Sequence, residues 1–511
     1  MLRISSKRFK GVALVAALLT VMPSLIASAA DDPTWTAPDV WARPYIGSGF
    51  AMRAESDDRG DTFVLWSTCC AQQGLYVSRY VAGFGWESPR QFAAHAEVRG
   101  VGFDVNGNGE AILVWADASP WVLRALRYAP GAGWRELAEI ERGEGQNGPG
   151  LAAAALDENG TAYVAWVHSE FVGNRLQLPN FDFEVRAARS LGEGWQHGGR
   201  LDLSPADDNL YNLAVAASPG GGAVAVWTAM RNETALGVFA SVALPSGGWG
   251  NTAMVSGPET RFTLRTVVGA DRQGHYFAAW ASMEPNQTDI AVVRGSAEGW
   301  EAPRVVGLNA NPYGYWDEPS VAVSDAGEAV VAWSQVPPNG TMRYVTYAPE
   351  ANWSAPRSFG PETGSSRGPQ VIGGGNAPFA IGWTTSPDPL FNEVDLWWAP
   401  IHVTNGIGLP VRIAERRFVN EPAFAEDRFG NSIVVWGVFP QVAGQGEFFA
   451  AYRTVVPLEG IRSPALENPV YGIVAVAAAA TGGALFVVWR KRKRETRTEG
   501  ASEPELPGTP R

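Results

Sequence analysis

The chain has 511 residues, of which 46% are hydrophobic and 18% charged, and this composition excludes an intrinsically disordered chain. Its formal net charge of −12 excludes a nucleic-acid partner held by bulk charge. The 58 glycines, 36 prolines and 21 tryptophans are typical of many short strands joined by tight turns and packed on indole rings, and not of a helical protein.

The N-terminal segment has the features of a secretory signal. Four basic residues within the first ten precede an apolar stretch from Val12 to Ile26, and the small residues Ala27, Ser28 and Ala29 follow. This order predicts a signal peptide over residues 1–30. An N-terminal membrane anchor is the alternative, which the short apolar stretch disfavours.

Cysteine and histidine are sparse. The two cysteines, Cys69 and Cys70, are adjacent, so they predict no disulfide framework of the long-loop kind. Outside the cytoplasm they can form a vicinal disulfide or remain as thiols in a loop, and both alternatives stay open. The five histidines form no His-x-His or His-Glu-x-x-His pair, so the sequence predicts no metal site.

An internal repeat of about 53 residues is the strongest pattern in the chain. A tryptophan closes an apolar run eight times, and a glycine stands six residues before it in every unit except the seventh, which has Ala377. The eight tryptophans are Trp66, Trp115, Trp166, Trp227, Trp280, Trp333, Trp383 and Trp436. A repeat of this length predicts one structural module per unit.

Each unit predicts four short antiparallel strands, which form one blade of a β-propeller. In the sixth unit, residues 320–324 and 328–334 flank a glycine turn, residues 341–347 form a third strand, and Trp353 opens a fourth. We therefore expect an all-β, eight-bladed β-propeller over residues 31–460. Seven blades plus an irregular unit is the structural alternative.

The first residues of this domain are predicted to close the ring. The eighth unit lacks the marker of a fourth strand, whereas Trp35-Thr36-Ala37-Pro38 copies the marker Trp300-Glu301-Ala302-Pro303 of the fifth unit. An N-terminal strand around Trp35 is thus expected to complete the last blade, which removes the free sheet edges.

The pattern resembles the secreted β-propeller repeats of sialidase-like, Asp-box proteins. Ser56-x-Asp58-x-Gly60-x-Thr62 fits the Asp-box pattern, and Phe63 stands where that pattern has an aromatic residue. The resemblance implies the propeller architecture and a glycan-related function. It transfers no catalytic arginine to this sequence, and the glycine turn here is expected between strands one and two, where the Asp-box joins strands three and four.

A candidate ligand site lies where the inner strands begin. The spacing between repeat markers is longest in the third unit, which places an insertion around residues 169–184, on the face that also carries the links between blades. Polar residues fifteen or sixteen positions before the repeat tryptophans are expected to ring the channel mouth on that face, with Trp316 offering a flat surface for a sugar. They are Arg99, Asn212, Arg265, Glu318, Arg367 and Glu421. Arginines there suit a carboxylate or sulfate, and mutual Arg–Glu pairing in a wet channel mouth is the alternative.

Two weaker motifs concern calcium and glycosylation. Asp104-x-Asn106-x-Asn108-Gly109 matches the start of a calcium loop, but Trp115 occupies the twelfth position, so a hairpin turn is the favoured interpretation and calcium the weak alternative. Among five Asn-x-Ser/Thr sequons, those at Asn232, Asn286 and Asn339 are expected in loops, where glycans are accepted.

The C-terminal region predicts a membrane anchor. After a linker over residues 461–469, residues 470–489 carry no charge and are followed directly by five basic residues. This pattern predicts a transmembrane helix, then a basic stop and a disordered cytoplasmic tail over residues 490–511. The topology is type I, at the cell membrane, with the propeller outside the cytoplasm.

These patterns favour a surface-anchored binding or adhesion module for a glycan or protein at the cell envelope. A sialidase-like glycoside hydrolase or lyase at the channel mouth is the alternative, with Glu318 or Glu421 as general acid or base. A quinone-dependent dehydrogenase is a third interpretation, prompted by eight blades and adjacent cysteines. Between residues 31 and 468 there are 29 Arg, no Lys and 48 Asp plus Glu, so this part carries 29 − 48 = −19 charges. We therefore expect it to be repelled by anionic lipid and other polyanions unless a local cluster of arginines intervenes.

Overall fold

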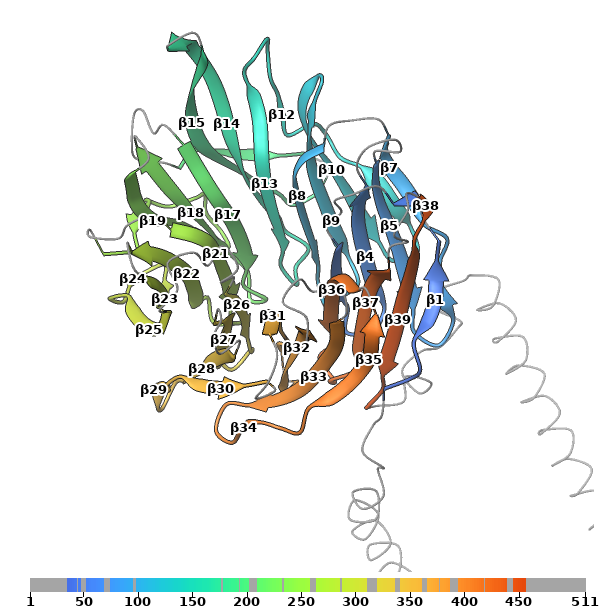
Figure 1. The fold of residues 1–511 in the computed structure, drawn as a ribbon. Helices are drawn as coiled ribbons and strands as arrows, with labels where there is room; N and C mark the ends of the chain where they lie inside the picture. Colours follow the sequence, from blue (N-terminus) through green and yellow to red (C-terminus); the bar gives the residue numbers. More distant parts are fainter. Residues whose placement is uncertain are drawn as a thin grey trace, which may run out of the picture.

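Eight antiparallel sheets follow one another around a ring in the computed structural model of the chain (Figure 1). The eight-bladed β-propeller is thereby confirmed, and the alternative of seven blades is wrong. The structure describes residues 35–43, 45–46, 52–68, 74–94, 98–175, 178–192, 194–201, 209–231, 234–257, 263–284, 287–309, 319–335, 341–360, 365–375, 377–386, 394–417, 419–438 and 444–455.

Each of the first four blades runs from an inner strand at the channel to an outer strand at the rim. Blade one comprises β3 (Met52–Ser56), β4 (Thr62–Thr68), β5 (Gly74–Val81), β6 (Gly85–Trp86) and β7 (Arg90–Ala94). Blade two comprises β8 (Val98–Val105), β9 (Ala111–Ala118), β10 (Trp121–Ala129), β11 (Gly133–Glu136) and β12 (Glu141–Arg142). Blade three comprises β13 (Gly148–Leu156), β14 (Ala162–Arg175), β15 (Leu178–Ser190) and β16 (Gln196–Arg200). Blade four comprises β17 (Asn209–Ala217), β18 (Ala223–Arg231), β19 (Thr234–Ala243) and β20 (Ala253–Met254).

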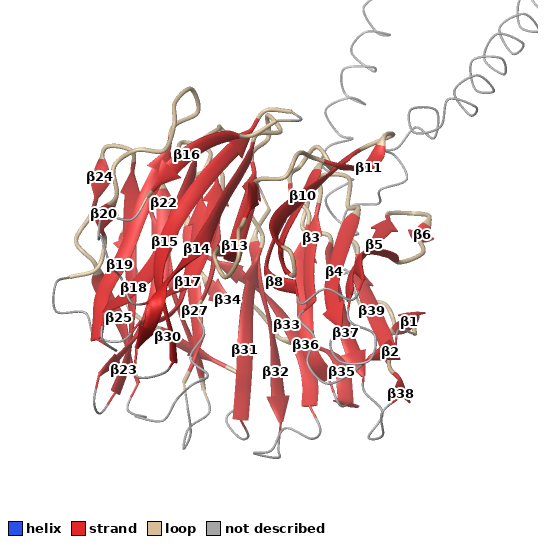
Figure 2. Ribbon diagram, turned by 90° about the horizontal axis from the view of Figure 1, so that it is seen from above, coloured by secondary structure: helices blue, strands red, loops and turns tan. Residues whose placement is uncertain are grey.

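Blades five to seven repeat the same order, and their strands pair antiparallel. Figure 2 shows the described residues as strands joined by loops and turns. Blade five comprises β21 (Thr263–Ala270), β22 (Tyr276–Glu284), β23 (Gln287–Ser296), β24 (Gly299–Trp300) and β25 (Arg304–Asn309). Blade six comprises β26 (Ser320–Val323), β27 (Ala329–Ser334), β28 (Met342–Ala348), β29 (Asn352–Trp353) and β30 (Arg357–Phe359). Blade seven comprises β31 (Ser365–Ile372), β32 (Phe379–Ser386), β33 (Val394–His402), β34 (Gly406–Ile407) and β35 (Val411–Arg417).

The eighth blade joins the two ends of the domain, as the sequence predicts. It comprises β36 (Val419–Glu426), β37 (Ser432–Val438), β39 (Glu447–Arg453) and the N-terminal β1 (Asp39–Ala42). β1 pairs antiparallel with β39, and Trp35 forms a further bridge with Arg453. A short pair of β2 (Tyr45–Ile46) and β38 (Gly444–Gln445) extends the same junction.

The indole of Trp41 fixes this closing strand. Trp41 stacks on Trp86 of blade one at 4.0 Å between ring centroids, and it meets Trp66 edge-on at 5.6 Å. Its Nε1 donates to the carbonyl oxygen of Phe449 at 3.2 Å. Aromatic pairs in such geometries contribute beyond their buried area, so β1 is held by both of the blades that it joins.

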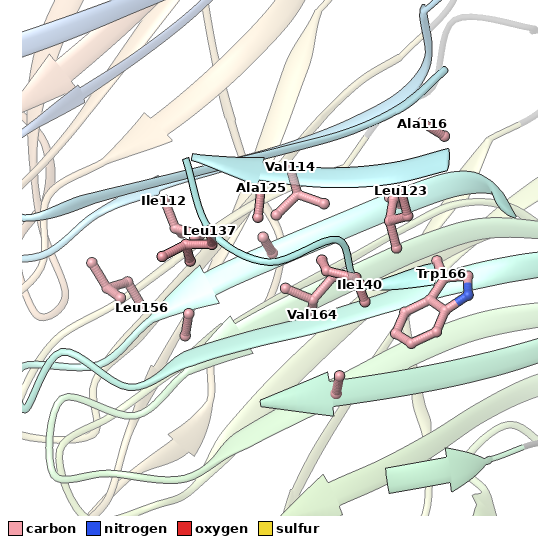
Figure 3. Packing of buried hydrophobic residues seen from close by; sticks show 14 residues of the cluster. Ile112, Val114, Ala116, Leu123, Ala125, Leu137, Ile140, Leu156, Val164 and Trp166 are labelled. Carbon is pink, nitrogen blue, oxygen red and sulfur yellow. The ribbon is translucent and has the colours of Figure 1, made fainter. Parts of the chain in front are cut away.

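The core is a set of layers between neighbouring blades. Each repeat tryptophan is at most 4% exposed, because the second strand of a blade is covered on both faces by adjacent blades. Between blades two and three, for example, Ile112, Val114 and Leu123 pack against Val164 and Trp166 (Figure 3). This two-sided burial explains why the second strands are apolar runs instead of alternating patterns.

Candidate functional site

The turns between the first and second strands of the blades define one face of the ring, here called the turn face. In most blades an Asp or Asn nine residues before the repeat tryptophan opens this turn. Its side-chain Oδ1 accepts hydrogen bonds from the backbone N–H groups two and four residues later, at distances of 2.7 to 3.1 Å; the residues are Asp57, Asn106, Asp157, Asp271 and Asp427. Side-chain closure of this kind is the usual role of Asp and Asn in turns.

The glycine of the repeat completes the same turn. Gly60, Gly109, Gly160, Gly221, Gly274, Gly327 and Gly430 have φ between 77° and 102°, the region that disfavours residues with a Cβ. Turns of neighbouring blades are also linked to one another, for example by Asn106 Nδ2 to the carbonyl oxygen of Asp157 at 2.9 Å. The glycines and Asp or Asn residues of the repeat are therefore explained by the structure of the turn face.

The hydrogen bonds around Asn106 agree with the hairpin interpretation of the calcium-like motif. Asn106 Oδ1 accepts from the backbone of Asn108 and Glu110, whereas Asp104 Oδ2 accepts from Leu156 N at 2.7 Å in the next blade. Among the residues that the structure describes, no three His, Cys, Asp or Glu side chains are placed to hold a metal ion.

The second residue of each turn lies around the channel mouth on the turn face. At this position, eight residues before the repeat tryptophan, stand Asp58, Gly107, Glu158, Pro219, Arg272, Asp325, Gly375 and Arg428. Seven of these eight line one cavity of about 640 Å³ along the channel, Gly107 being the exception. Two ion pairs cross between blades here, Arg272–Asp325 at 2.8 Å and Arg428–Asp58 at 2.9 Å. The mouth on this face is thus largely self-paired.

Three ionisable residues line the channel on two neighbouring inner strands: Arg53 and Glu55 on β3, and Asp104 on β8. Burial raises the pKa of Glu55 to about 8, the nearby Asp104 raises it further, and Arg53 acts in the opposite direction. Burial also raises the pKa of Asp104 to about 7, against the hydrogen bonds from the backbone N–H groups of Leu156 and Val105. Strongly shifted pKa values in a cavity are typical of functional sites.

Sequence reasoning missed Arg53 and Glu55. They stand thirteen and eleven residues before Trp66, and the equivalent positions of blades three to eight hold uncharged residues, mostly Ala, Gly and Val. Charged residues on an otherwise small and apolar inner strand were the available signal. Asp104 occupies the position of Glu55 in blade two, and the sequence analysis assigned it to the calcium-like motif instead of the channel.

The opposite face, here called the loop face, carries the loops between second and third strands and the links between blades. Near this face six inner strands contain a shift in register, in β8, β13, β17, β21, β31 and β36. Such bulges re-aim side chains at the ends of strands. Five of the six periodic residues that we predicted as a ligand site fall on or next to these bulges: Arg99, Asn212, Arg265, Arg367 and Glu421.

The bulges differ in the residue that takes the left-handed conformation. Blades two and seven use Gly100 and Gly368, with φ of 61° and 60°, whereas blade four uses Asn212 at 54° and blade five uses Arg265 at 44°. Arg265 is exposed, and Thr266 beside it is buried and lies 3.2 Å from the Thr228 hydroxyl of blade four. A large side chain is thus kept at a position where glycine fits without strain.

The other predicted site residues are described to different extents. Arg367 lies in β31 beside the bulge and is half-buried, and burial lowers its pKa. Arg99 and Glu421 lie on β8 and β36, but their side chains are outside the described part. Trp316 and Glu318 lie outside the described residues altogether, as do Cys69, Cys70 and the sequons at Asn232, Asn286 and Asn339. A shared ligand site, and Glu318 or Glu421 as acid or base, remain predictions.

The insertion in the third unit forms an extended hairpin. β14 and β15 have 14 and 13 residues and pair as far as Arg175 with Leu178, and Figure 1 shows them reaching the upper edge of the ring. Ion pairs brace the base of this hairpin: Arg186 contacts Glu141 at 3.0 Å and Glu184 at 2.9 Å. Burial alone would raise the pKa of Glu141, but the hydrogen bond with His168, the charge of Arg186 and the hydrogen bond from Trp166 keep this pKa low.

Comparisons with known proteins add little to this picture. No family model matches the chain, and no curated protein does. Among solved structures, an ulvan lyase of polysaccharide lyase family 25 is similar with 12% identity and a TM-score of 0.44, over 84% of this chain and 99% of that chain. The lectin BP39L from Burkholderia pseudomallei has 14% identity and a TM-score of 0.43, over 73% and 100%. The intramolecular trans-sialidase from Ruminococcus gnavus has 8% and 0.37, over 82% and 97%.

No helix among the described residues is both long and apolar enough to cross a membrane. The predicted span over residues 470–489 and the predicted signal peptide over residues 1–30 lie outside the described ranges.

Proposed function

We propose that the protein is an exported binding module that recognises a glycan bearing carboxylate or sulfate groups at the loop face of its propeller. A signal peptide over residues 1–30 would direct its export, and a membrane helix over residues 470–489 would hold it at the cell surface, with the propeller outside. A protein ligand with similar anionic groups is the other form of this proposal.

The observation that carries the proposal is the conformation of Arg265. A non-glycine residue at φ 44° costs of order 1 kcal/mol, and the same bulge in blades two and seven is built on glycine. Strained backbone conformations cluster at binding and active sites, and here the strained residue presents an exposed arginine on the loop face. A guanidinium suits planar, bidentate contact with carboxylate or sulfate, and Arg367 stands at the equivalent edge of blade seven.

The asymmetry of the two faces supports the same conclusion. The turn face repeats one turn and joins its blades by hydrogen bonds and ion pairs. The loop face bears the long β14–β15 hairpin, and variation on a rigid scaffold is where binding is usually found.

Substitution Arg265→Gly tests the proposal, because glycine preserves the bulge and removes only the side chain. The full chain is applied to an array of sulfated, uronate-containing and neutral oligosaccharides. We expect the native protein to retain anionic members, and Arg265→Gly to weaken that binding about tenfold or more while the variant stays folded.

The control is Arg90→Ala, which removes an exposed arginine from the outer strand β7 and should leave binding unchanged. Unaltered binding by Arg265→Gly to a glycan that the native protein retains would place the ligand elsewhere. Retention of neutral oligosaccharides alone would remove the role given to arginine.

A further inference from the structure

The channel holds a second candidate site, separate from the loop face. Its cavity of about 640 Å³ falls in the size range of small-molecule pockets. On β3, Met52 and Ala54 pack against Ala423 and Ala425 of blade eight, so the alternating residues Arg53 and Glu55 share the other side of the strand.

The charges in this cavity are poorly compensated by the protein. Among the residues that the structure describes, the Arg53 guanidinium and the Glu55 carboxylate have no hydrogen bond or ion pair. Both also touch the water of the channel, since Arg53 is exposed and Glu55 partly so. Burial lowers the pKa of Arg53 and raises those of Glu55 and Asp104, and the attraction between Arg53 and Glu55 offsets only part of their shifts.

We propose that this cavity binds a small zwitterion, an amino acid whose carboxylate pairs with Arg53 and whose ammonium group lies between Glu55 and Asp104. Such a ligand supplies each uncompensated charge with its counterpart in one molecule. Arg53 and Glu55 stand two residues apart on one side of a strand, which separates their Cα atoms by about 7 Å. This separation favours an ω-amino acid or a short peptide with free termini over an α-amino acid.

The charged groups at the turn-face mouth fit entry of a molecule with both signs. Asp325 and Asp58 are paired with Arg272 and Arg428 at this mouth, so its charges largely cancel and repel neither end of a zwitterion. The inner cluster of one guanidinium and two carboxylates is matched by neither a simple anion nor a simple amine. A zwitterion satisfies all three groups.

A series of zwitterions of increasing length tests the proposal on the full chain. Glycine, β-alanine, 4-aminobutyrate, 6-aminohexanoate and glycylglycine are titrated by calorimetry, with butylamine and butyrate as probes that carry one charge. We expect saturable binding with an optimum at one length, at least about tenfold tighter than for either monofunctional probe. Binding near pH 7 should release protons, because an ammonium group favours the ionised carboxylates, so the measured heat should depend on the buffer.

Two variants locate the site. Arg53→Gln and Glu55→Gln should each weaken the best zwitterion about tenfold or more, whereas Glu447→Gln, at an exposed ion pair on the rim, should not. If either channel variant fails to fold, the length series on the native chain still decides. Absence of saturable heat up to about 10 mM, equal binding of butylamine, or unchanged affinity in folded Arg53→Gln would each overturn the proposal. None of these outcomes depends on glycan binding at Arg265.

Discussion

Single glycines on the turn face show how a repeated residue can serve the same conformation in different surroundings. Gly109 and Gly274 occupy the same position in blades two and five, with φ of 81° and 82°. A Cβ at Gly109 would stand 2.5 Å from Asp57 Oδ2 of blade one, whereas a Cβ at Gly274 would meet nothing within 4 Å. A substitution at Gly274 therefore tests backbone strain alone, whereas one at Gly109 tests backbone strain together with a contact between blades.

Alanine at these two positions should have unequal effects on stability. We expect Gly274→Ala to lower the free energy of unfolding by about 1 kcal/mol, the cost of a Cβ in the left-handed region. Gly109→Ala should cost about 2–4 kcal/mol, because it also displaces the Asp57 carboxylate that closes the neighbouring turn. Urea denaturation of both variants measures the difference, and equal losses would show that the Asp57 contact adds nothing.

At the residue scale, the sequence predicted the repeat glycines and tryptophans better than the residues of the candidate sites. The spacing of glycine and tryptophan predicted every blade, because those residues answer to backbone conformation and burial. The positive φ of Arg265 and Asn212 left no mark in the sequence, since the bulge depends on pairing with the next strand. Arg53 and Glu55 were overlooked because which side of an inner strand faces the channel depends on how the blades pack.

At the scale of the element, the partner blade of the N-terminal strand was predicted correctly, but the strand was expected around Trp35 and β1 spans Asp39–Ala42. The fourth-strand marker around Trp35 was sufficient because the eighth unit visibly lacked one, and Trp35 does pair with Arg453. The long β14–β15 hairpin appeared in the sequence only as irregular spacing. The spacing predicted an insertion, but it could not predict that the inserted residues would pair with each other and lengthen both strands.

Trp41 should govern the attachment of β1. Trp41→Ala removes the stack on Trp86, the edge contact with Trp66 and the hydrogen bond to Phe449, and should cost about 2–4 kcal/mol. Trp41→Phe keeps an aromatic ring in the layer and should cost less. Amide hydrogen exchange reports the result directly: in Trp41→Ala, β39 should lose protection while blades three to five keep theirs. Uniform loss of protection would mean that closure and the rest of the ring unfold together.

At the scale of the whole molecule, the channel carboxylates tie stability to pH. Burial raises the pKa of Glu426 to about 8, against the Ser432 hydroxyl and Arg453, and Glu55 and Asp104 are shifted in the same direction. The folded protein therefore holds protons that the unfolded chain releases above its ordinary carboxyl pKa of about 4. Because the folded state binds more protons, the free energy of unfolding should fall as pH rises from about 4 to about 8.

Glu426→Gln isolates one of these groups. At pH 8 the variant should be more stable than the native protein, since it carries no charge in the enclosed site, and at pH 5 the two should be close. Thermal melting of both proteins across this range measures the two slopes. Identical slopes would mean that the native Glu426 ionises as easily in the folded as in the unfolded chain.

The pairing of β1 with β39 has a consequence for biogenesis. Trp41 and Phe449 are 408 positions apart, so β1, which closes the propeller, is synthesised first and its partner β39 last. A chain delivered from its N-terminus must carry an unsatisfied edge until nearly the whole domain has emerged. During that interval the leading strand of one molecule can dock on the trailing blade of another, and such reciprocal exchange would yield an intertwined dimer with the same contacts. A high concentration of newly made chains should therefore favour swapped pairs, and dilution should favour the closed monomer.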